Sequence, residues 1–314
     1  MQRVLITGAA GFIGSHACEA FAQAGYDTIG VDNFDPYYDR RIKQTNVAAI
    51  EAAGAHFREA DIRDAEGTAS LFDVTKPDVI VHLAAKAGVR NSEKFPAEYV
   101  QTNVNGTQSV LDAARRNDVE RVVMASTSSV YGSASSIPFV EDDPAAAPLQ
   151  PYAASKRAAE ILAGTYCSLY GLQVTVTRLF TVYGPRGRPD MMPYMLARSC
   201  RDGSSVPLFE GPLERDWTYV GDIVDGLVQA AENPLGFEIL NLGRGEPVAL
   251  SEFIDEIAAV AGTPPVLEPR ARPATELLTT FADSSKARER IGFDPTVSVH
   301  EGVARFWDWF AAQS

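Results

Sequence analysis

The chain has 314 residues, 46% of them hydrophobic, which is enough for a large core in one or two domains. Its net charge is −13 and no basic run stands out, so nucleic acid and anionic membrane surfaces are disfavoured as partners. The three cysteines are scattered, which favours buried thiols in a reducing compartment over a disulfide framework or a metal cluster. The first residues already form a strand pattern and no apolar run is long enough to span a membrane, so we expect a cytoplasmic protein with no metal site.

The chain opens with an apolar run over 4–6, a glycine-spaced turn and a helical pattern over 15–24. In this arrangement Gly8 allows a tight turn, and Gly11 lets backbone N–H groups approach a pyrophosphate. Gly14 lets the helix pack close to the strand. The helix N-terminus also offers free N–H groups and a favourable dipole to an anion. This stretch therefore predicts the start of a dinucleotide-binding fold.

Strand and helical patterns then alternate along the chain. The second strand ends at Asp32, where a carboxylate would hydrogen-bond a ribose hydroxyl. Near-continuous apolar strands separated by helices predict an α/β protein with a Rossmann-type, doubly wound parallel sheet. The ligand of such a sheet lies off the carboxyl ends of its strands, where Asp32, Asp61, Ala84 and Thr181 should border one cleft. The expected strands after the first cover 28–31, 56–60, 77–85, 121–126, 172–180 and 238–242, and the longest helices cover 97–117 and 153–170.

The pattern changes after Phe180, where prolines interrupt it and charges cluster between them. Short amphipathic helices are expected over 250–261, 284–291 and 300–312. We predict a smaller C-terminal substrate lobe interleaved with the last strands of the sheet. The dinucleotide-binding domain would cover 1–180 with returning strands near 216–245, and the lobe would cover 181–215 and 246–314.

A phenol and an ammonium stand one helical turn apart, at Tyr152 and Lys156. A free tyrosine has a pKa of about 10, and a nearby ammonium lowers it by favouring the phenolate. Such a pair can take a proton from an alcohol while a hydride leaves the same carbon. The spacing alone is common by chance, but the hydroxyl row 126–129 at an upstream strand end could hydrogen-bond the same substrate oxygen.

Together these motifs resemble the extended short-chain dehydrogenase/reductase family, in particular its nucleotide-sugar epimerases and dehydratases. The resemblance covers nearly the whole chain in the family's order. The segments that carry it are 7–14, 32–33, 61–62, 82–85, 103–107, 126–132, 152–156 and 215–222.

The resemblance implies a bound nicotinamide dinucleotide. Tyr152 would be the acid/base, Lys156 would hold the nicotinamide ribose and tune Tyr152, and Thr127 would be their hydroxyl partner. Asp32 favours NAD over NADP because it repels a 2′-phosphate. Lys86 departs from the family, which usually has a neutral polar residue there. The residues expected to bind NAD are Gly8, Gly11, Phe12, Ile13, Gly14, Asp32, Asn33, Asp61, Ile62, Leu83, Ala84, Ala85, Lys86, Asn103, Tyr152 and Lys156.

A narrower resemblance concerns the substrate. Segments 32–39, 87–90 and 181–191 look like those of UDP-glucuronate 4-epimerases, which have Thr at position 181 where most relatives have Asn. Arg188 can form a bidentate pair with a carboxylate. The diphosphate arginines would be Arg215 and Arg272, although the usual Arg-x-Gly-Asp reads Arg-Pro-Ala-Thr here. The residues expected to bind the UDP-sugar are Arg90, Thr127, Ser128, Ser129, Thr181, Arg186, Arg188, Arg215 and Arg272.

The activity implied is 4-epimerisation of UDP-glucuronic acid to UDP-galacturonic acid through a 4-keto sugar, without decarboxylation. Alternatives are a UDP-glucuronate decarboxylase, a UDP-glucose/galactose 4-epimerase and a non-catalytic NAD-binding protein. A dehydratase is disfavoured, because Ser128 and Ser129 stand where dehydratases carry an Asp-Glu pair. The resemblance also implies a homodimer in which helices 97–117 and 153–170 form a four-helix bundle.

Overall fold

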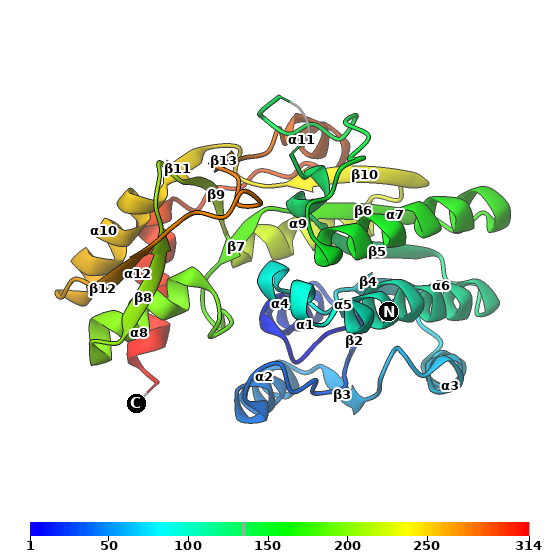
Figure 1. The fold of residues 1–314 in the computed structure, drawn as a ribbon. Coiled ribbons are helices and arrows are strands. Elements are labelled where there is room, and N and C mark those ends of the chain that lie inside the picture. Colours follow the sequence, from blue (N-terminus) through cyan, green and yellow to red (C-terminus); the bar gives the residue numbers. More distant parts are fainter. Residues whose placement is uncertain (134–135, 314) are drawn as a thin grey trace.

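The computed structural model of the chain describes residues 1–133 and 136–313. Its larger part is a seven-stranded sheet in which every neighbouring pair of strands is parallel (Figure 1). The strand order is β10-β6-β5-β4-β1-β2-β3, so the winding reverses between β1 and β4. This confirms the predicted doubly wound α/β fold. The strands are β1 (Arg3–Thr7), β2 (Asp27–Asp32), β3 (His56–Glu59), β4 (Val79–His82), β5 (Arg121–Thr127), β6 (Val174–Leu179) and β10 (Phe237–Leu242).

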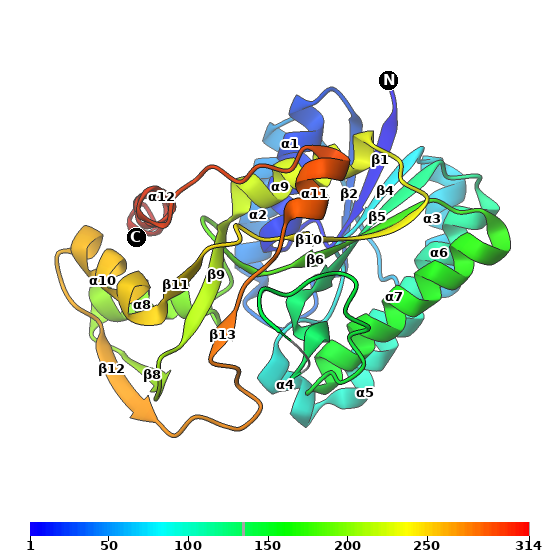
Figure 2. The ribbon, with the colours of Figure 1, turned by 90° about the horizontal axis from the view of Figure 1, so that it is seen from above.

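Helices cover both faces of this sheet because successive strand residues point to opposite sides. Val4 and Ile6 of β1 pack with one face's helices, whereas Leu5 packs with those of the other. Figure 2 shows the two layers on either side of the sheet. The first layer holds α1 (Phe12–Gln23), α2 (Arg40–Ala52), α9 (Val220–Glu232) and α11 (Ser285–Ile291), and the second holds α3 (Ala65–Thr75), α6 (Thr107–Arg116) and α7 (Pro151–Tyr170).

The helix predicted over 97–117 is not one regular α-helix. After α4 (Val89–Lys94), the short α5 (Pro96–Tyr99) leads into a π-helical stretch, Val100–Gly106, and then into α6. A Cβ on Gly106 would lie 2.7 Å from Ile62 Cδ1, so this backbone runs very close to the loop after β3. The wider π-helical turn carries the fully buried Asn103, and such turns are frequent near functional sites.

The smaller lobe contains two small sheets and three helices among the described residues. β7 (Thr181–Tyr183), β9 (Glu214–Tyr219), β11 (Pro247–Ala249) and β13 (Thr279–Thr280) form one sheet, and β8 (Ser205–Phe209) pairs with β12 (Val266–Arg270). The helices are α8 (Met192–Asp202), α10 (Leu250–Ala261) and α12 (Val299–Ala311). Two of these helices, α10 and α12, match the amphipathic segments predicted over 250–261 and 300–312. The segment expected as a lobe helix over 284–291 is α11, which instead packs on β10 and α9 of the main sheet.

The strands expected to return to the main sheet near 216–245 divide between the two parts, so that expectation is corrected. β10 joins β6, whereas β9 pairs with β7, β11 and β13. The fully buried carboxylate of Asp216 explains this placement, because it accepts N–H groups from Arg244, Gly245 and Ala282. These bonds tie β9 to the segments that follow β10 and β13. Across the described residues, no helix is both long and apolar enough to cross a membrane.

Candidate active site

The turn between β1 and α1 is built from glycines that leave no room for side chains. Gly8 has a φ of +75°, and a Cβ there would lie 2.8 Å from the backbone nitrogen of Ala84. A Cβ on Gly14 would overlap the carbonyl oxygen of Gly8. The N-terminus of α1 therefore faces a backbone-lined cradle of the kind that receives a pyrophosphate.

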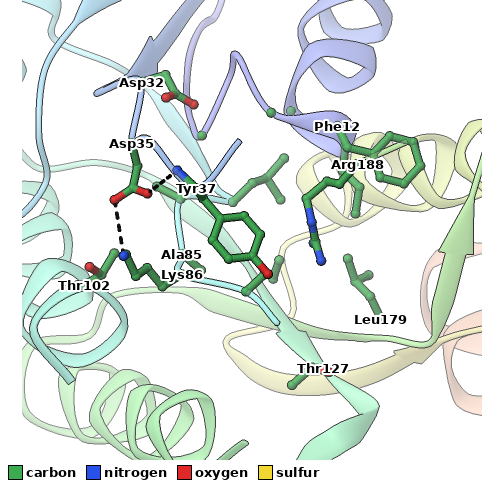
Figure 3. Close-up of a pocket in the computed structure, with 18 of the residues that line it drawn as sticks. Phe12, Asp32, Asp35, Tyr37, Ala85, Lys86, Thr102, Thr127, Leu179 and Arg188 are labelled. Atoms are coloured by element: carbon green, nitrogen blue, oxygen red, sulfur yellow. Dashed lines mark hydrogen bonds and ion pairs between the residues drawn. The ribbon is translucent and has the colours of Figure 1, made fainter. Parts of the chain in front are cut away.

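A cavity lies at the carboxyl edge of the main sheet and extends from this cradle (Figure 3). It gathers residues from the ends of β1, β2, β4 and β5 and from α7, as expected for a doubly wound sheet. The predicted site residues that line it are Gly8, Gly11, Phe12, Ile13, Gly14, Asp32, Asn33, Ile62, Leu83, Ala84, Ala85, Lys86, Thr127, Tyr152, Lys156 and Arg188.

Asp32 forms an ion pair that the sequence analysis missed. Its Oδ1 accepts the N–H of Phe34 at 2.8 Å and lies 3.2 Å from Nζ of Lys43 in α2. Both members of the pair are buried and line the cavity. Within the described residues Oδ2 of Asp32 accepts no hydrogen bond, so it is available to a ribose hydroxyl. The carboxylate at the end of β2 thus offers the hydrogen-bond acceptor that a nucleotide ribose needs.

Asp61 lies beside this region without lining the cavity. Partial burial raises the pKa of Asp61, but hydrogen bonds from Arg63 and Asn33 and the charge of Arg63 outweigh this effect and bring the pKa down to about 2. The Arg63 Nη2 to Asp61 Oδ2 distance is 2.5 Å, and the Asn33 Nδ2 distance is 3.0 Å. Asp61 is therefore an ionised anchor for Asn33, while its neighbour Ile62 faces the cavity.

Asn103 also lies behind the cavity wall. Its amide donates to the carbonyl of Lys86 at 3.0 Å and to Ser155 Oγ at 2.9 Å, and its oxygen accepts the Lys86 N–H at 2.7 Å. The π-helical stretch therefore holds the loop that follows β4 in place. The predicted contact of Asn103 with the cofactor stays a prediction, whereas its hold on Lys86 is observed.

A buried histidine supports the same loop. His82 Nε2 is 3.0 Å from Thr107 Oγ1, which itself donates to the Asn103 carbonyl, so the ring nitrogen must be the donor in this pair. Nδ1 then accepts from Thr7 Oγ1 at 2.7 Å. Burial lowers the pKa of His82 to about 3, so the ring is neutral and links β1, β4 and α6.

Three side chains of the predicted catalytic set meet in the cavity. Thr127 ends β5, and its Oγ1 accepts the N–H of Ser129 and donates to Ser129 Oγ, both at 3.2 Å. Burial raises the pKa of Tyr152, while the Thr127 hydroxyl and the charge of Arg188 lower it. The guanidinium of Arg188 is therefore one cation that favours the Tyr152 phenolate. The predicted effect of Lys156 on Tyr152 stays a prediction.

Lys156 lies one turn further along α7 and is 3% exposed. Burial lowers its pKa to about 8, and the charge of Glu160 acts in the opposite direction. Nothing in the described part of the chain hydrogen-bonds to its Nζ. A buried ammonium that faces a cavity without a partner fits a ligand hydroxyl or anion there.

Arg188 is held by two residues that the sequence analysis missed. Its Nε lies 2.9 Å from Asp190 Oδ1 and its Nη2 3.1 Å from Oδ2, a bidentate pair. Tyr37 donates to Asp190 Oδ2 at 2.9 Å, and the guanidinium carbon lies 5.8 Å from the Tyr37 ring centre. The paired edge of Arg188 is thus occupied, and within the described chain Nη1 has no partner. Asp190 stands only two residues from Arg188, but a loop pattern does not reveal such a contact.

Two other arginines predicted to bind the substrate contact protein side chains in this structure, and their substrate contacts stay predictions. Arg186 Nη2 lies 2.6 Å from Glu19 Oε1 of α1, so this side chain joins its loop to a helix. Arg90 is exposed, with its guanidinium 4.6 Å from the ring centre of Phe209.

The arginines predicted for the diphosphate converge on the segment after β12. Arg215 Nη2 lies 2.5 Å from Glu276 Oε1, and Arg272 Nη1 donates to the Glu276 carbonyl at 2.5 Å. Their role toward a diphosphate stays a prediction, and it requires Arg215 to leave or share Glu276. The predicted residues that do not line the cavity are Asp61, Arg90, Asn103, Ser128, Ser129, Thr181, Arg186, Arg215 and Arg272.

Residues 4–243 match the NAD dependent epimerase/dehydratase family. The chain belongs to this family. The chain is 37% identical over 312 residues to the UDP-glucuronate 4-epimerase of Thermodesulfobacterium geofontis, and the match covers 98% of this chain and 96% of that protein. The crystal structure of UDP-glucuronic acid 4-epimerase from Bacillus cereus, in complex with UDP-glucuronic acid and NAD, matches with a TM-score of 0.92 at 32% identity over 100% of both chains. UDP-glucose 4-epimerase from Thermotoga maritima, solved with UDP-glucose, matches with a TM-score of 0.88 at 30% identity over 99% of both chains.

The family resemblance, the enzyme class and the cofactor expected from the sequence are confirmed. The protein is an NAD-dependent nucleotide-sugar epimerase. The glycine cradle, the open Oδ2 of Asp32 and the unpartnered ammonium of Lys156 are groups that suit the pyrophosphate and the riboses of NAD.

Proposed function

We propose that this epimerase acts on UDP-glucuronic acid, inverts C4 and releases UDP-galacturonic acid with its carboxylate intact. The observation that carries the proposal is Arg188, which reaches the cavity beside Tyr152 and keeps Nη1 without a partner in the described chain. A sugar carboxylate is the group that such a guanidinium edge recognises best. The similarity to two UDP-glucuronate 4-epimerases supports the same substrate.

In the proposed reaction Tyr152 takes the proton of the C4 hydroxyl while C4 loses a hydride. The 4-keto sugar then turns over, so C4 would regain the hydride on its opposite face while Tyr152 returns the proton to the C4 oxygen. The Thr127 hydroxyl hydrogen-bonds the C4 oxygen, and Lys156 binds the nicotinamide ribose. Bound NAD supplies a hydride acceptor and donor, so no other oxidant is consumed. The cradle from Gly8 to Gly14 and the carboxylate of Asp32 would hold the dinucleotide.

The 4-keto sugar of this reaction is a β-keto acid, which can lose CO₂. Loss is fastest when the breaking C–C bond is perpendicular to the ketone plane. A carboxylate hydrogen-bonded within that plane is therefore protected. We assign this role to Arg188, with the hydroxyl of Thr127, which also lines the cavity. The predicted contributions of Ser128, Ser129 and Thr181, which do not line it, stay predictions.

The proposal is tested by incubating the purified protein with UDP-glucuronic acid, without added cofactor, and identifying the product by NMR. UDP-galacturonic acid without CO₂ release supports it. A UDP-pentose would show that the carboxylate is released, and no conversion of UDP-glucuronic acid, even after NAD is added, would refute the substrate. Tyr152→Phe is the matched control, since it should lose turnover by a factor of about 100 or more while keeping bound NAD.

One observation favours a second candidate, a UDP-glucose 4-epimerase. Asp190 neutralises the bidentate edge of Arg188, so the sugar end of the cavity carries less positive charge than the arginine alone would give it. The similarity to the Thermotoga maritima enzyme points the same way. The ratio of kcat/KM for UDP-glucuronic acid and UDP-glucose separates the two candidates.

We further propose a cytoplasmic homodimer formed through α5, the π-helical stretch, α6 and α7. Large apolar side chains are exposed along these helices, including Val100, Ile161 and Leu169, of which Leu169 is 67% exposed. The three cysteines are free, which suits a reducing compartment. Light scattering after size exclusion tests the dimer: Ile161→Glu should give a monomer, and the control Val266→Glu on the distant strand β12 should not. A monomeric wild-type protein would refute it.

A further inference from the structure

An ion pair crosses the cavity between the loops that follow β2 and β4. Asp35 Oδ2 and Lys86 Nζ are 3.7 Å apart, and both side chains line the cavity (Figure 3). In the sheet β1 lies between β2 and β4, and the glycine cradle begins at the end of β1. The pair therefore joins the two loops that flank the place where the dinucleotide enters the cradle.

Both ends of this bridge are held by their surroundings. Asn103 fixes the backbone N–H and the carbonyl of Lys86. Asp35 donates its N–H to Asn33 Oδ1 at 2.9 Å, and its Oδ1 accepts the N–H of Tyr37 at 3.1 Å. Opening the bridge thus requires movement of the Lys86 side chain and no change in either loop.

Lys86 has a second anionic partner on its own side of the cavity. Its Nζ also pairs with the carboxylate of Glu98 in α5. The Lys86 side chain is 14% exposed and that of Asp35 21%, so the pair is only partly screened by water. When the ammonium leaves Asp35 it keeps Glu98, which lowers the cost of opening.

We propose that the Lys86–Asp35 pair is a latch over the NAD cleft that must open before the cofactor enters or leaves. The proposal rests on NAD as the cofactor and not on the choice of sugar. An epimerase regenerates NAD in every turnover, so slow release of the cofactor costs it nothing.

The test measures NAD release from the purified holoenzyme in the absence of sugar. Excess alcohol dehydrogenase and ethanol convert each released NAD to NADH, whose absorbance reports the rate. Asp35→Asn keeps the acceptor for Tyr37 but removes the charge, and release should become about fivefold faster, which corresponds to about 1 kcal/mol. The matched control is Asp27→Asn, which breaks the Arg3–Asp27 pair at the opposite end of β2 and should leave release unchanged.

A second variant separates the latch from a direct contact between Lys86 and the cofactor phosphates. In the latch, Lys86→Gln also speeds release, and the double variant Lys86→Gln/Asp35→Asn is no faster than the faster single variant. If Lys86 held the phosphates directly, Asp35→Asn would leave release unchanged or slow it. That result, or additive effects in the double variant, overturns the latch. Because no sugar is present, neither result bears on the proposed substrate.

Discussion

The replacement Arg188→Ala tests the proposed sugar site most directly. Arg188 Nη1 has no partner in the described chain, so a substrate carboxylate would take one or two charge-assisted hydrogen bonds from it. Each such bond is worth about 1.5–3 kcal/mol, which is roughly a 10- to 100-fold change. We therefore expect kcat/KM for UDP-glucuronic acid to fall roughly 10- to 100-fold, while kcat/KM for UDP-glucose changes much less. Steady-state assays with both substrates measure the two values.

The carboxylate of Asp190 complicates this variant, because without Arg188 it keeps Tyr37 as its only side-chain donor among the described residues. Its charge would repel the substrate carboxylate and enlarge the loss. The double variant Arg188→Ala/Asp190→Asn removes both charges, and its kcat/KM for UDP-glucuronic acid should still fall at least about tenfold. The control is Arg186→Ala, which removes an arginine two residues away that pairs with Glu19. It should leave the ratio of kcat/KM for UDP-glucuronic acid and UDP-glucose unchanged. Equal losses for both substrates in Arg188→Ala would refute the carboxylate contact.

Three further predictions concern the cofactor and the fold. Gly14→Ala should be purified without NAD, since its Cβ would overlap the Gly8 carbonyl, and retained NAD measured by chromatography would contradict this. NAD affinity should fall as the pH rises through about 8, because the Lys156 ammonium loses its proton there, and titrations with Lys156→Gln should show no such dependence. The pKa of His82 is about 3 when folded and about 6.5 when unfolded, so the unfolded chain binds the extra proton between these values. The contribution of His82 to stability should therefore fall by about 2 kcal/mol from pH 7 to pH 5. Denaturant unfolding would show this as a weaker dependence of the unfolding free energy on pH in His82→Gln than in the wild type.

The parts of the site that were predicted correctly depend on local geometry. The glycine spacing fixes a turn because only the backbone fits between Gly8, Gly14 and Ala84. One helical turn places Tyr152 and Lys156 along the same side of α7, whatever the rest of the chain does. Strand ends in a parallel sheet also meet at one edge by construction, so the cavity could be located before its side chains were known.

The parts that were missed depend on contacts between distant segments. Arg186 meets Glu19, which is 167 positions away in the sequence. Lys86 meets Asp35 because the strands before their loops, β4 and β2, both lie next to β1 in the sheet. The strand pattern of β9 does not reveal which sheet it joins, since the buried contacts of Asp216 decide that. Pairing between charges is set by the fold, and the sequence only supplies the candidates.

This pairing also resolves how a chain of net charge −13 can receive an anionic sugar nucleotide. Most of the arginines predicted for the substrate already have a partner: Arg186 has Glu19, Arg215 has Glu276 and one edge of Arg188 has Asp190. Among the cavity cations of the described chain, Lys156 Nζ and Arg188 Nη1 are left without a partner. Unpaired positive charge is therefore offered at two points of the cavity wall, Lys156 and Arg188, rather than spread over the cavity. In the proposed reaction a field of this shape would orient the sugar by its carboxylate and leave the rest of the surface repellent to polyanions.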